Sequence, residues 1–209
     1  MKSKTPAAAT TDKRQQIIQA ASDAFLNKGY QNASMEAIAG DAGVAKQTLY
    51  NYFGNKDALF AEVVNLFCAC ENKELRSDDI SSSSVEKAFK AYAQGLISDL
   101  ASRENTALFR MMVAEAIHFP NLGKMFFEAG MERDRQLLIE FLKRQHQAGN
   151  LLIDNVEQAA LFIQGALNTY FRPKYIMTGE VPSHDALESY LDYCIKKILL
   201  LYQPLDASN

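Results

Sequence analysis

The sequence predicts an all-α fold of about nine helices, in which a small N-terminal three-helix part precedes a larger C-terminal helical part. Two observations predict this class. Apolar residues recur at helical spacing in every strongly periodic segment, as Ile17, Ala21 and Phe25 do, whereas no segment alternates apolar and polar residues in the manner of a strand. Glycine, proline, serine and asparagine also stand where such helices should begin and end.

The N-terminal elements follow from their end signals. Residues 1–11 are rich in alanine and threonine, and we predict a flexible N-terminal arm there. The first helix follows and ends at Gly29, because glycine adopts the left-handed conformation that closes many helices. Ser34 and Asn55 precede two later apolar runs, and each is predicted to cap the helix that it begins.

The later elements are separated by a linker and by prolines. Residues 77–84, with the sequence SDDISSSS, predict a linker because they are polar and of low complexity. Pro120 suits the first turn of a helix, Asp154 begins another, and Ser183 begins the last. Pro173 either ends or kinks the helix in which it lies, and the sequence leaves both outcomes open.

Composition limits the class of protein. The chain has 209 residues, of which 48% are hydrophobic and 22% charged, as in ordinary globular proteins. Three cysteines are too few and too uneven for a disulfide framework and favour a reducing compartment. The N-terminal residues have no apolar core of a secretory signal, and no run of about 18 apolar residues could span a membrane. We therefore expect a cytoplasmic protein with no membrane partner.

Charge is distributed unevenly along the chain. The first 57 residues carry seven Lys or Arg and five Asp or Glu, whereas the remainder carries fifteen and twenty. A basic end on an acidic body is expected when only that end meets phosphate groups. The asymmetry is small, so it supports a nucleic-acid partner without defining one.

Residues 34–53, with the sequence SMEAIAGDAGVAKQTLYNYF, predict two short helices around a tight turn. Ile38 belongs to the buried stripe of the first helix, and Leu49 and Phe53, four residues apart, form that of the second. Gly43 lies at the corner, where a left-handed residue costs least. This is the helix-turn-helix plan, in which the second helix enters the major groove of DNA.

The outward side chains of the second helix suit DNA contact. Gln47 can bond bidentately to adenine, Thr48 can meet a thymine methyl group or a phosphate, and tyrosine hydroxyls can meet phosphate oxygens. A solvated hairpin with an inert polar face is the alternative that spacing alone leaves open. The predicted DNA-binding residues are Ser34, Lys46, Gln47, Thr48, Tyr50, Asn51, Tyr52 and Lys56.

Residues 11–64 resemble the DNA-binding head of the TetR (tetracycline-repressor-like) family of bacterial regulators. The resemblance lies in three motifs: F-x-x-K-G-Y, S-M-E-A-I-A-x-x-A-G-V and T-L-Y-x-Y-F-x-x-K-x-x-L. It implies a DNA-binding domain at residues 12–57 and a ligand-binding and dimerisation domain at residues 58–209. The chain departs from the family at Ala45, where a serine cap is common, and at Gln47, where glycine is common. The positions that commonly touch DNA in the family match Ser34, Lys46, Thr48, Tyr50, Tyr52 and Lys56.

The last two long helices carry apolar residues on all sides. Residues 158–171 hold no charged residue, and Leu199, Leu200 and Leu201 lie beyond the main apolar stripe of the last helix. A helix that is apolar all round must be covered on all sides. We predict a homodimer through these two helices, which would set two recognition helices on a pseudopalindromic operator. Coverage within one chain is the alternative.

The middle of the chain is dense in methionine and phenylalanine, which suits an adaptable apolar cavity of about 300–1,000 Å³. Residues 108–130 resemble the ligand-binding domain of an AcrR- or AefR-like subgroup, which implies a hydrophobic or amphipathic small-molecule effector. The candidate pocket residues are Phe89, Tyr92, Phe109, Met112, Glu115, His118, Phe126 and Phe162.

Catalytic and metal chemistry find little support in the sequence. Glu115 and His118 have the Glu-x-x-His spacing of di-iron bundles, but such sites need a second copy and two further glutamates. No G-x-S-x-G, P-loop or H-E-x-x-H motif occurs. We therefore predict no catalytic residue, no metal and no cofactor. The predicted function is a DNA-binding transcriptional regulator, in the first instance a ligand-responsive repressor; an inducer-free architectural factor and a helical-bundle enzyme are the alternatives.

Overall fold

The computed structural model describes residues 6–68, 73–78, 81–168, 171–180 and 182–204, and these residues form α-helices, one π-helical segment and no strand. The all-α prediction is confirmed, although the described helices outnumber the predicted nine. The helices are α1 (Pro6–Asn32), α2 (Met35–Asp41), α3 (Lys46–Phe53), α4 (Lys56–Phe67), α5 (Lys73–Arg76), α6 (Ser82–Ala101), α7 (Arg103–Glu115), α8 (Pro120–Phe127), η1 (Glu128–Glu132), α9 (Arg133–Gln147), α10 (Val156–Asn168), α11 (Phe171–Thr178) and α12 (His184–Tyr202).

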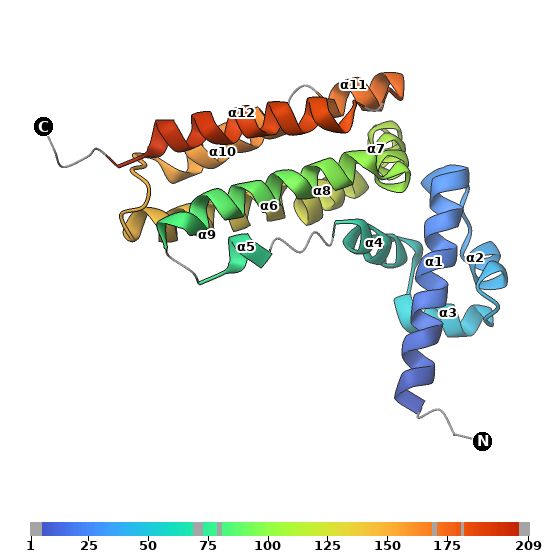
Figure 1. Ribbon diagram of the computed structural model, residues 1–209. Helices are drawn as coiled ribbons and strands as arrows, with labels where there is room; N and C mark the ends of the chain where they lie inside the picture. Colours follow the sequence, from blue (N-terminus) through green and yellow to red (C-terminus); the bar gives the residue numbers. More distant parts are fainter. Residues whose placement is uncertain (1–5, 69–72, 79–80, 169–170, 181, 205–209) are drawn as a thin grey trace, which may run out of the picture. The chain divides into compact units, whose positions relative to one another are not determined.

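The chain divides into two compact units (Figure 1). The head unit comprises residues 1–69 and 107–130, and the body unit comprises residues 70–106 and 131–209. The head unit extends past residue 57, the predicted end of the DNA-binding domain, and the bounds of that domain stay a prediction. Along the sequence, the division between the units falls between residues 69 and 70, then within α7, and then within η1.

The core of the head unit explains why it extends past residue 57. α1 and α4 pack together through fully buried aromatic rings, with the Phe25 and Phe60 centroids 5.1 Å apart. The same cluster takes in apolar side chains from α7 and α8, namely Leu108, Met112 and Leu122. A domain of under 60 residues buries little apolar surface, so these added helices complete its core.

Side-chain caps confirm three of the predicted helix starts. The Ser34 hydroxyl accepts the Ala37 N–H at 3.2 Å, and the Asn55 carbonyl oxygen accepts the Ala58 N–H at 2.8 Å. Ser183 accepts in the same way at the start of α12. Asp154, in contrast, does not cap α10: the Gln158 N–H bonds to Asn155 Oδ1 at 2.9 Å. Asp and Asn cap helices about equally well, so the sequence could not choose between neighbours.

Two proline positions sharpen the sequence prediction. α1 begins at Pro6, within the segment predicted as a flexible arm, and residues 1–5 lie outside the described residues. Pro173 lies in the first turn of α11, where the missing N–H has no intrahelical partner to lose. The linker predicted at residues 77–84 lies between α5 and α6, and residues 79–80 lie outside the described part.

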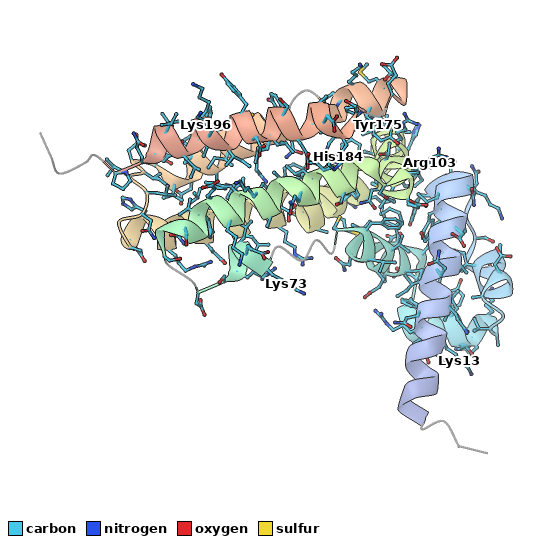
Figure 2. All side chains as sticks on the ribbon, in the orientation of Figure 1. Lys13, Lys73, Arg103, Tyr175, His184 and Lys196 are labelled. Carbon is cyan, nitrogen blue, oxygen red and sulfur yellow. The ribbon has the colours of Figure 1, made fainter. Side chains whose placement is uncertain are left out.

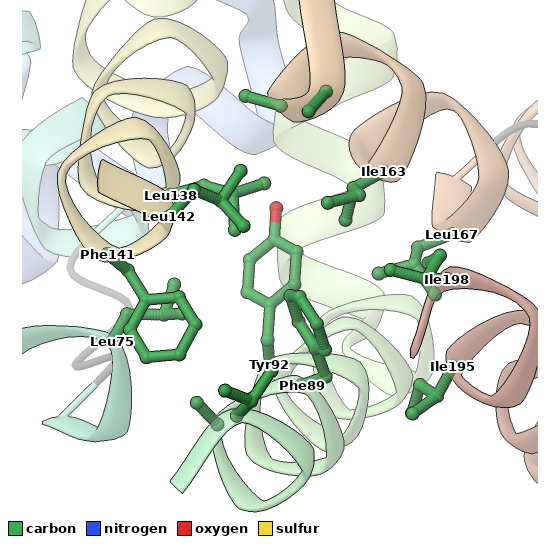
Figure 3. Close-up of a cluster of buried hydrophobic side chains, with 14 of the residues drawn as sticks. Leu75, Phe89, Tyr92, Leu138, Phe141, Leu142, Ile163, Leu167, Ile195 and Ile198 are labelled. Carbon is green, nitrogen blue, oxygen red and sulfur yellow. The ribbon is translucent and has the colours of Figure 1, made fainter. Parts of the chain in front are cut away.

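The core of the body unit is built by α6, α9, α10 and α12 around Phe89 and Tyr92 of α6 (Figure 3). Phe89 is fully buried and meets the ring of Phe141 edge-on, with centroids 6.0 Å apart. Ile163 of α10 and Ile195 of α12 belong to the same cluster. Side chains fill the space between the ribbons of α6 and α12 (Figure 2), so the body unit has a packed interior between these helices.

Candidate nucleic-acid interface

The turn between α2 and α3 is fixed by apolar packing and by backbone bonds. Ile38 and Leu49 are fully buried, and Ala39 is nearly so where the two helices meet. Gly43 has a φ of 65°, which a residue with a side chain rarely adopts. The Val44 N–H donates to the Ala39 carbonyl at 3.0 Å and closes the corner. α2 and α3 are therefore a preformed pair.

The outward face of α3 presents polar side chains that the fold does not bury. Lys46, Gln47 and Asn51 are exposed, whereas Thr48 and Tyr50 are half-buried at the edge of the head core. Gln47 Nε2 donates to Asn51 Oδ1 at 2.9 Å, one helical turn along the same face. An exposed amide pair of this kind can open toward a base edge at little cost, because water satisfies both groups in the meantime.

Lys46 pairs with Glu36 across the turn. The hydrogen bond from the Lys46 ammonium lowers the pKa of the Glu36 carboxyl, and the same contact raises the pKa of Lys46. The ammonium also lies 5.6 Å from the centroid of the Tyr50 ring. Both charged groups are exposed, and exposed pairs are weak. A DNA phosphate can therefore replace Glu36 as the partner of Lys46.

Ser34 and Ala45 precede the two helices of the motif. Ser34 is exposed at the start of α2, where its hydroxyl serves as the cap. Ala45 begins α3 without a side-chain cap. The first amides of α3 are thus left to solvent or to an anion, which free amides at a helix start attract.

Lys56 is the residue whose surroundings differ most from its predicted role. Its ammonium donates to three backbone carbonyls, those of Tyr30 at 2.8 Å, Gln31 at 3.3 Å and Ala33 at 3.0 Å. It also lies 4.3 Å from the Tyr30 ring centroid. An ammonium has three N–H donors, and all three are occupied here. These contacts give Lys56 a structural role in the head unit, and its predicted phosphate contact stays a prediction.

The eight predicted pocket residues do not form one lining. In the body unit, Phe89 and Tyr92 are core residues, whereas Phe162 is 52% exposed on α10. In the head unit, Met112 is buried, and His118 is exposed. The remaining three are Phe109 and Phe126, which pair edge-to-face at 5.9 Å, and Glu115, which contacts the end of α1. The sequence could not separate these environments, because apolar residues at helical spacing occur in all of them.

The body unit contains an open hollow of about 510 Å³ between α6, α12 and the loop before α10. Its apolar floor includes Val85, Leu151 and Leu199, and charged residues stand around it, including Lys90 and Asp192. None of the predicted pocket residues lines this hollow. Its size falls in the range of small-molecule sites.

A charged cluster in the body unit escaped the sequence analysis. Arg172 of α11 forms an ion pair with Asp99 of α6, and Asn105 donates to the same carboxylate. Burial raises the pKa of nearby Asp134 from its ordinary 3.8 to about 6. The neighbouring arginines, of which Arg133 has the largest effect, lower this pKa, and the charge of Asp99 raises it. These residues are far apart in sequence, so no motif marks them.

Two further searches concern ions and membranes. The described residues hold no group of three or more His, Cys, Asp or Glu side chains arranged to bind a metal ion. Among the same residues, none of the helices has both the length and the apolar composition that crossing a bilayer requires.

A preformed helix pair whose second helix presents unburied polar side chains has the geometry of a helix-turn-helix DNA-binding motif. Residues 17–63 match the family of bacterial regulatory proteins described as tetR, and residues 87–204 match the AefR-like transcriptional repressor C-terminal domain. The second match alone covers more than half of the chain. The protein belongs to the TetR family of transcriptional regulators, whose members bind operator DNA and act as dimers.

Known relatives agree in fold over nearly the whole chain. A TetR-family regulator from Mesorhizobium loti is 28% identical with a TM-score of 0.76, covering 96% of this chain and 100% of its own. The flavonoid-responsive regulator FrrA is also 28% identical with a TM-score of 0.76, covering 93% of this chain and 98% of its own.

Relatives known by sequence match in part. The transcriptional activator FasR of Mycolicibacterium smegmatis is 42% identical over 53 residues, which is 25% of this chain and 24% of FasR. The chain thus spans about a quarter of the length of this relative. The regulator SrpR of Pseudomonas putida is 24% identical over 148 residues, which is 71% of this chain and 68% of SrpR.

Proposed function

We propose that the protein is a ligand-responsive repressor that binds a pseudopalindromic operator as a homodimer. The single observation that carries the proposal is the outward face of α3. Lys46, Gln47 and Asn51 are exposed on it, while Leu49 and Phe53 of the same helix are buried. Such a division leaves the polar side chains outside the apolar core and available for DNA.

The proposed contacts divide by chemistry. Gln47 and Asn51 carry amides that can bond to base edges in the major groove, and Lys46 can reach guanine or phosphate. Ser34, Thr48, Tyr50 and Tyr52 carry hydroxyls that suit phosphate oxygens. Lys56 is assigned to the support of this surface, since its ammonium already has three carbonyl partners. The DNA-binding domain remains residues 12–57, supported by α4.

The homodimer is assigned to α10 and α12 of the body unit, which lie side by side (Figure 1). These helices leave large apolar side chains about half-exposed or more, and exposed apolar patches of this kind commonly mark protein–protein contacts. Pairing with a second copy would cover them and place two copies of α3 about one helical turn of DNA or more apart. The side chains are Leu161, Phe162, Tyr193, Leu200 and Leu201.

The effector is assigned to the body unit and to the hydrophobic or amphipathic class. The hollow of about 510 Å³ supports this, since an apolar floor and charged surroundings suit a molecule with both kinds of surface. The relation to FrrA, a flavonoid-responsive regulator at 28% identity, points to the same class of molecule. Phe89 and Tyr92, predicted pocket residues that lie in the core, would take part if the packed interior opened around a ligand.

DNA selection with the purified full-length chain tests the repressor proposal. We expect a random duplex pool to yield an inverted repeat, and we expect affinity for it to fall steeply as salt rises. Alanine in place of Gln47 should weaken binding to the selected duplex and relax preference at one base pair of each half-site. A chain that retains every duplex equally would end the proposal, whatever its affinity.

An inducer-free DNA-binding factor is the second candidate, favoured by the packed core of the body unit, where Phe89 is fully buried and Tyr92 is 3% exposed. Native mass spectrometry of the purified dimer separates the two candidates. A bound compound that releases the selected duplex supports the repressor. A dimer whose DNA affinity does not respond to any extracted or added amphipathic compound supports the inducer-free factor.

A further inference from the structure

The hollow of the body unit borders the helix face to which the homodimer is assigned. On α12 the hollow is lined by Asp192, Ile195, Lys196, Leu199 and Leu200. Leu200 is 49% exposed and also belongs to the apolar side chains of the α10–α12 face. Tyr193, which is 60% exposed, precedes Leu200 by two helical turns and therefore lies on the same side of α12. One wall of the hollow is thus continuous with the apolar face.

The floor of the hollow is held in place by the core of the body unit. Val85 of α6 and Leu151 of the loop before α10 are buried members of that core, and Leu199 packs against it. A ligand on this floor would lay its apolar part against side chains that are already ordered. The hollow can therefore accept a ligand while the packed interior around Phe89 stays closed, and binding to an ordered site costs less entropy.

The charged side chains around the hollow are not equally available to a ligand. Glu86 and Lys90 form an ion pair at 2.6 Å, and the charge of Asp192 also acts on Lys90. Lys196 lines the hollow as well, and among the described residues no carboxylate forms an ion pair with it. An anionic group in the hollow would find its cation at Lys196.

In the single chain, one side of the hollow is open to solvent, so a ligand there would keep part of its surface in water. Small-molecule sites usually bury most of the ligand. A second copy that packs on the α10–α12 face would stand beside Leu200 and could cover the open side. Because members of the TetR family act as dimers, a second copy is the cover that this chain itself supplies.

We propose that the hollow binds an amphipathic anion, whose acidic group meets Lys196, and that the bound anion strengthens the dimer through the shared wall at Leu200. The inference rests on the proposed function, which supplies both the effector site and the dimer face. A ligand that binds the dimer more tightly than the monomer must stabilise the dimer by the same free energy. Release of DNA by such an effector would then proceed without dissociation into monomers.

The experiment uses the full-length chain without DNA and anilinonaphthalene sulfonate (ANS) as the probe, an amphipathic anion whose fluorescence rises in apolar surroundings. ANS titrations measure the affinity per chain. Sedimentation velocity over a dilution series measures the dissociation constant of the dimer with and without saturating ANS. The variants are K196Q, which removes the cation, and the double variant L161E/F162E, which should prevent dimerisation. The control is K87Q, which changes an exposed lysine of α6 outside the hollow.

We expect K196Q to bind ANS about fivefold more weakly than the wild type and K87Q to bind it within about twofold. The monomeric double variant should bind ANS about threefold more weakly per chain than the wild-type dimer. Since a dimer has two such sites, saturating ANS should lower the dissociation constant of the wild-type dimer about tenfold. This dilution series decides the coupling if the double variant fails to fold.

Several outcomes would overturn the inference. ANS that binds the α10–α12 face itself would dissociate the dimer, which is an effect of opposite sign. An ANS titration that does not depend on Lys196 would place the anion outside the hollow. If the wild type is monomeric at every concentration, the homodimer of the proposed function fails and this inference fails with it. A wild-type dimer whose dissociation constant is the same with and without ANS sinks the inference alone.

Discussion

The head unit and the body unit leave opposite kinds of side chain uncovered. On α3 the exposed residues are polar, as Lys46 and Gln47 are, and water satisfies them without cost. On α10 and α12 the exposed residues include Leu161 and Leu201, at 50% and 59% exposure, and water does not satisfy them. An exposed apolar face therefore indicates a protein partner by itself. An exposed polar face indicates DNA only through its arrangement, which here is the second helix of a helix-turn-helix.

The same contrast recurs within the head unit between two lysines. Lys46 has an exchangeable partner, Glu36, on the surface. Lys56 has three backbone carbonyls at 2.8–3.3 Å and an aromatic ring beneath it. The sequence predicts a DNA contact for both lysines, yet only Lys46 has a single exposed side chain as its ion-pair partner. Residue type and spacing do not distinguish them, whereas the bonding partners do.

The largest predicted effect is on the apolar face of the body unit. Replacing Leu161 and Phe162 with glutamate places charges where a second copy should pack, so we expect a monomer in analytical ultracentrifugation at micromolar concentration. Affinity for the selected duplex should fall about 100-fold or more, because each head then binds its half-site alone.

The chain offers a matched control for that substitution. Leu152 is 53% exposed in the same unit but lies outside α10 and α12. L152E should remain a dimer with unchanged DNA affinity. Equal dissociation of L152E and the double variant would show that exposure alone, and not the α10–α12 face, decides assembly.

The two lysines of the head should respond in different observables. K56A should lower the free energy of unfolding by about 2 kcal/mol, since three backbone carbonyls lose a charged donor. K46A should leave stability unchanged and reduce the slope of log affinity against log salt by about one. Urea denaturation and salt titrations of duplex binding measure the two effects. If K56A is as stable as the wild type and shows the reduced slope of log affinity against log salt, the proposed difference between the two lysines is wrong.

Gly29, at the non-helical point of α1 before α2 begins, provides a stability test of the head unit. G29A should destabilise the head by about 2 kcal/mol, because its φ of 77° and ψ of 165° suit almost no other residue. The added β-carbon would also lie 2.7 Å from Glu115 Oε1 and would displace that carboxylate. G40A is the control: that glycine lies in α2, has open space around its β position and should gain up to about 1 kcal/mol. Equal melting temperatures for G29A and G40A would contradict the strain at Gly29.

Much of the fold could be predicted from the sequence because its signals are local. Ser34, Gly43 and Asn55 each act on neighbours within four residues. Ser34 and Asn55 cap helices as predicted, and Gly43 has the predicted positive φ. Lys56 and Glu115 contact residues 30–33, which are distant from both in sequence, so a pattern within one helix could not reveal these contacts. The pocket prediction had the same weakness, because helical periodicity marks Phe89 and Phe162 alike although one is buried and the other exposed.

The smallest predicted effect concerns Asp134 of the body unit, where nearby arginines offset only part of the effect of burial on the carboxyl. Burial raises its pKa to about 6 in the folded state from an ordinary 3.8, so the native protein binds this proton more tightly than the unfolded chain does. Stability therefore decreases as the pH rises from about 4 to about 6 and is lowered by a constant amount above that window.

D134N removes the charge, and we expect it to stabilise the protein by about 1 kcal/mol at pH 7.5, the full shift being discounted for partial solvent access. The gain should shrink toward zero near pH 4, where the wild-type carboxyl is neutral too. D78N, which changes an exposed aspartate of the same unit, should show no such dependence in parallel denaturation curves at fixed protein concentration. A gain in D134N that is equal at pH 4.5 and pH 7.5 would assign it to packing and not to the buried charge.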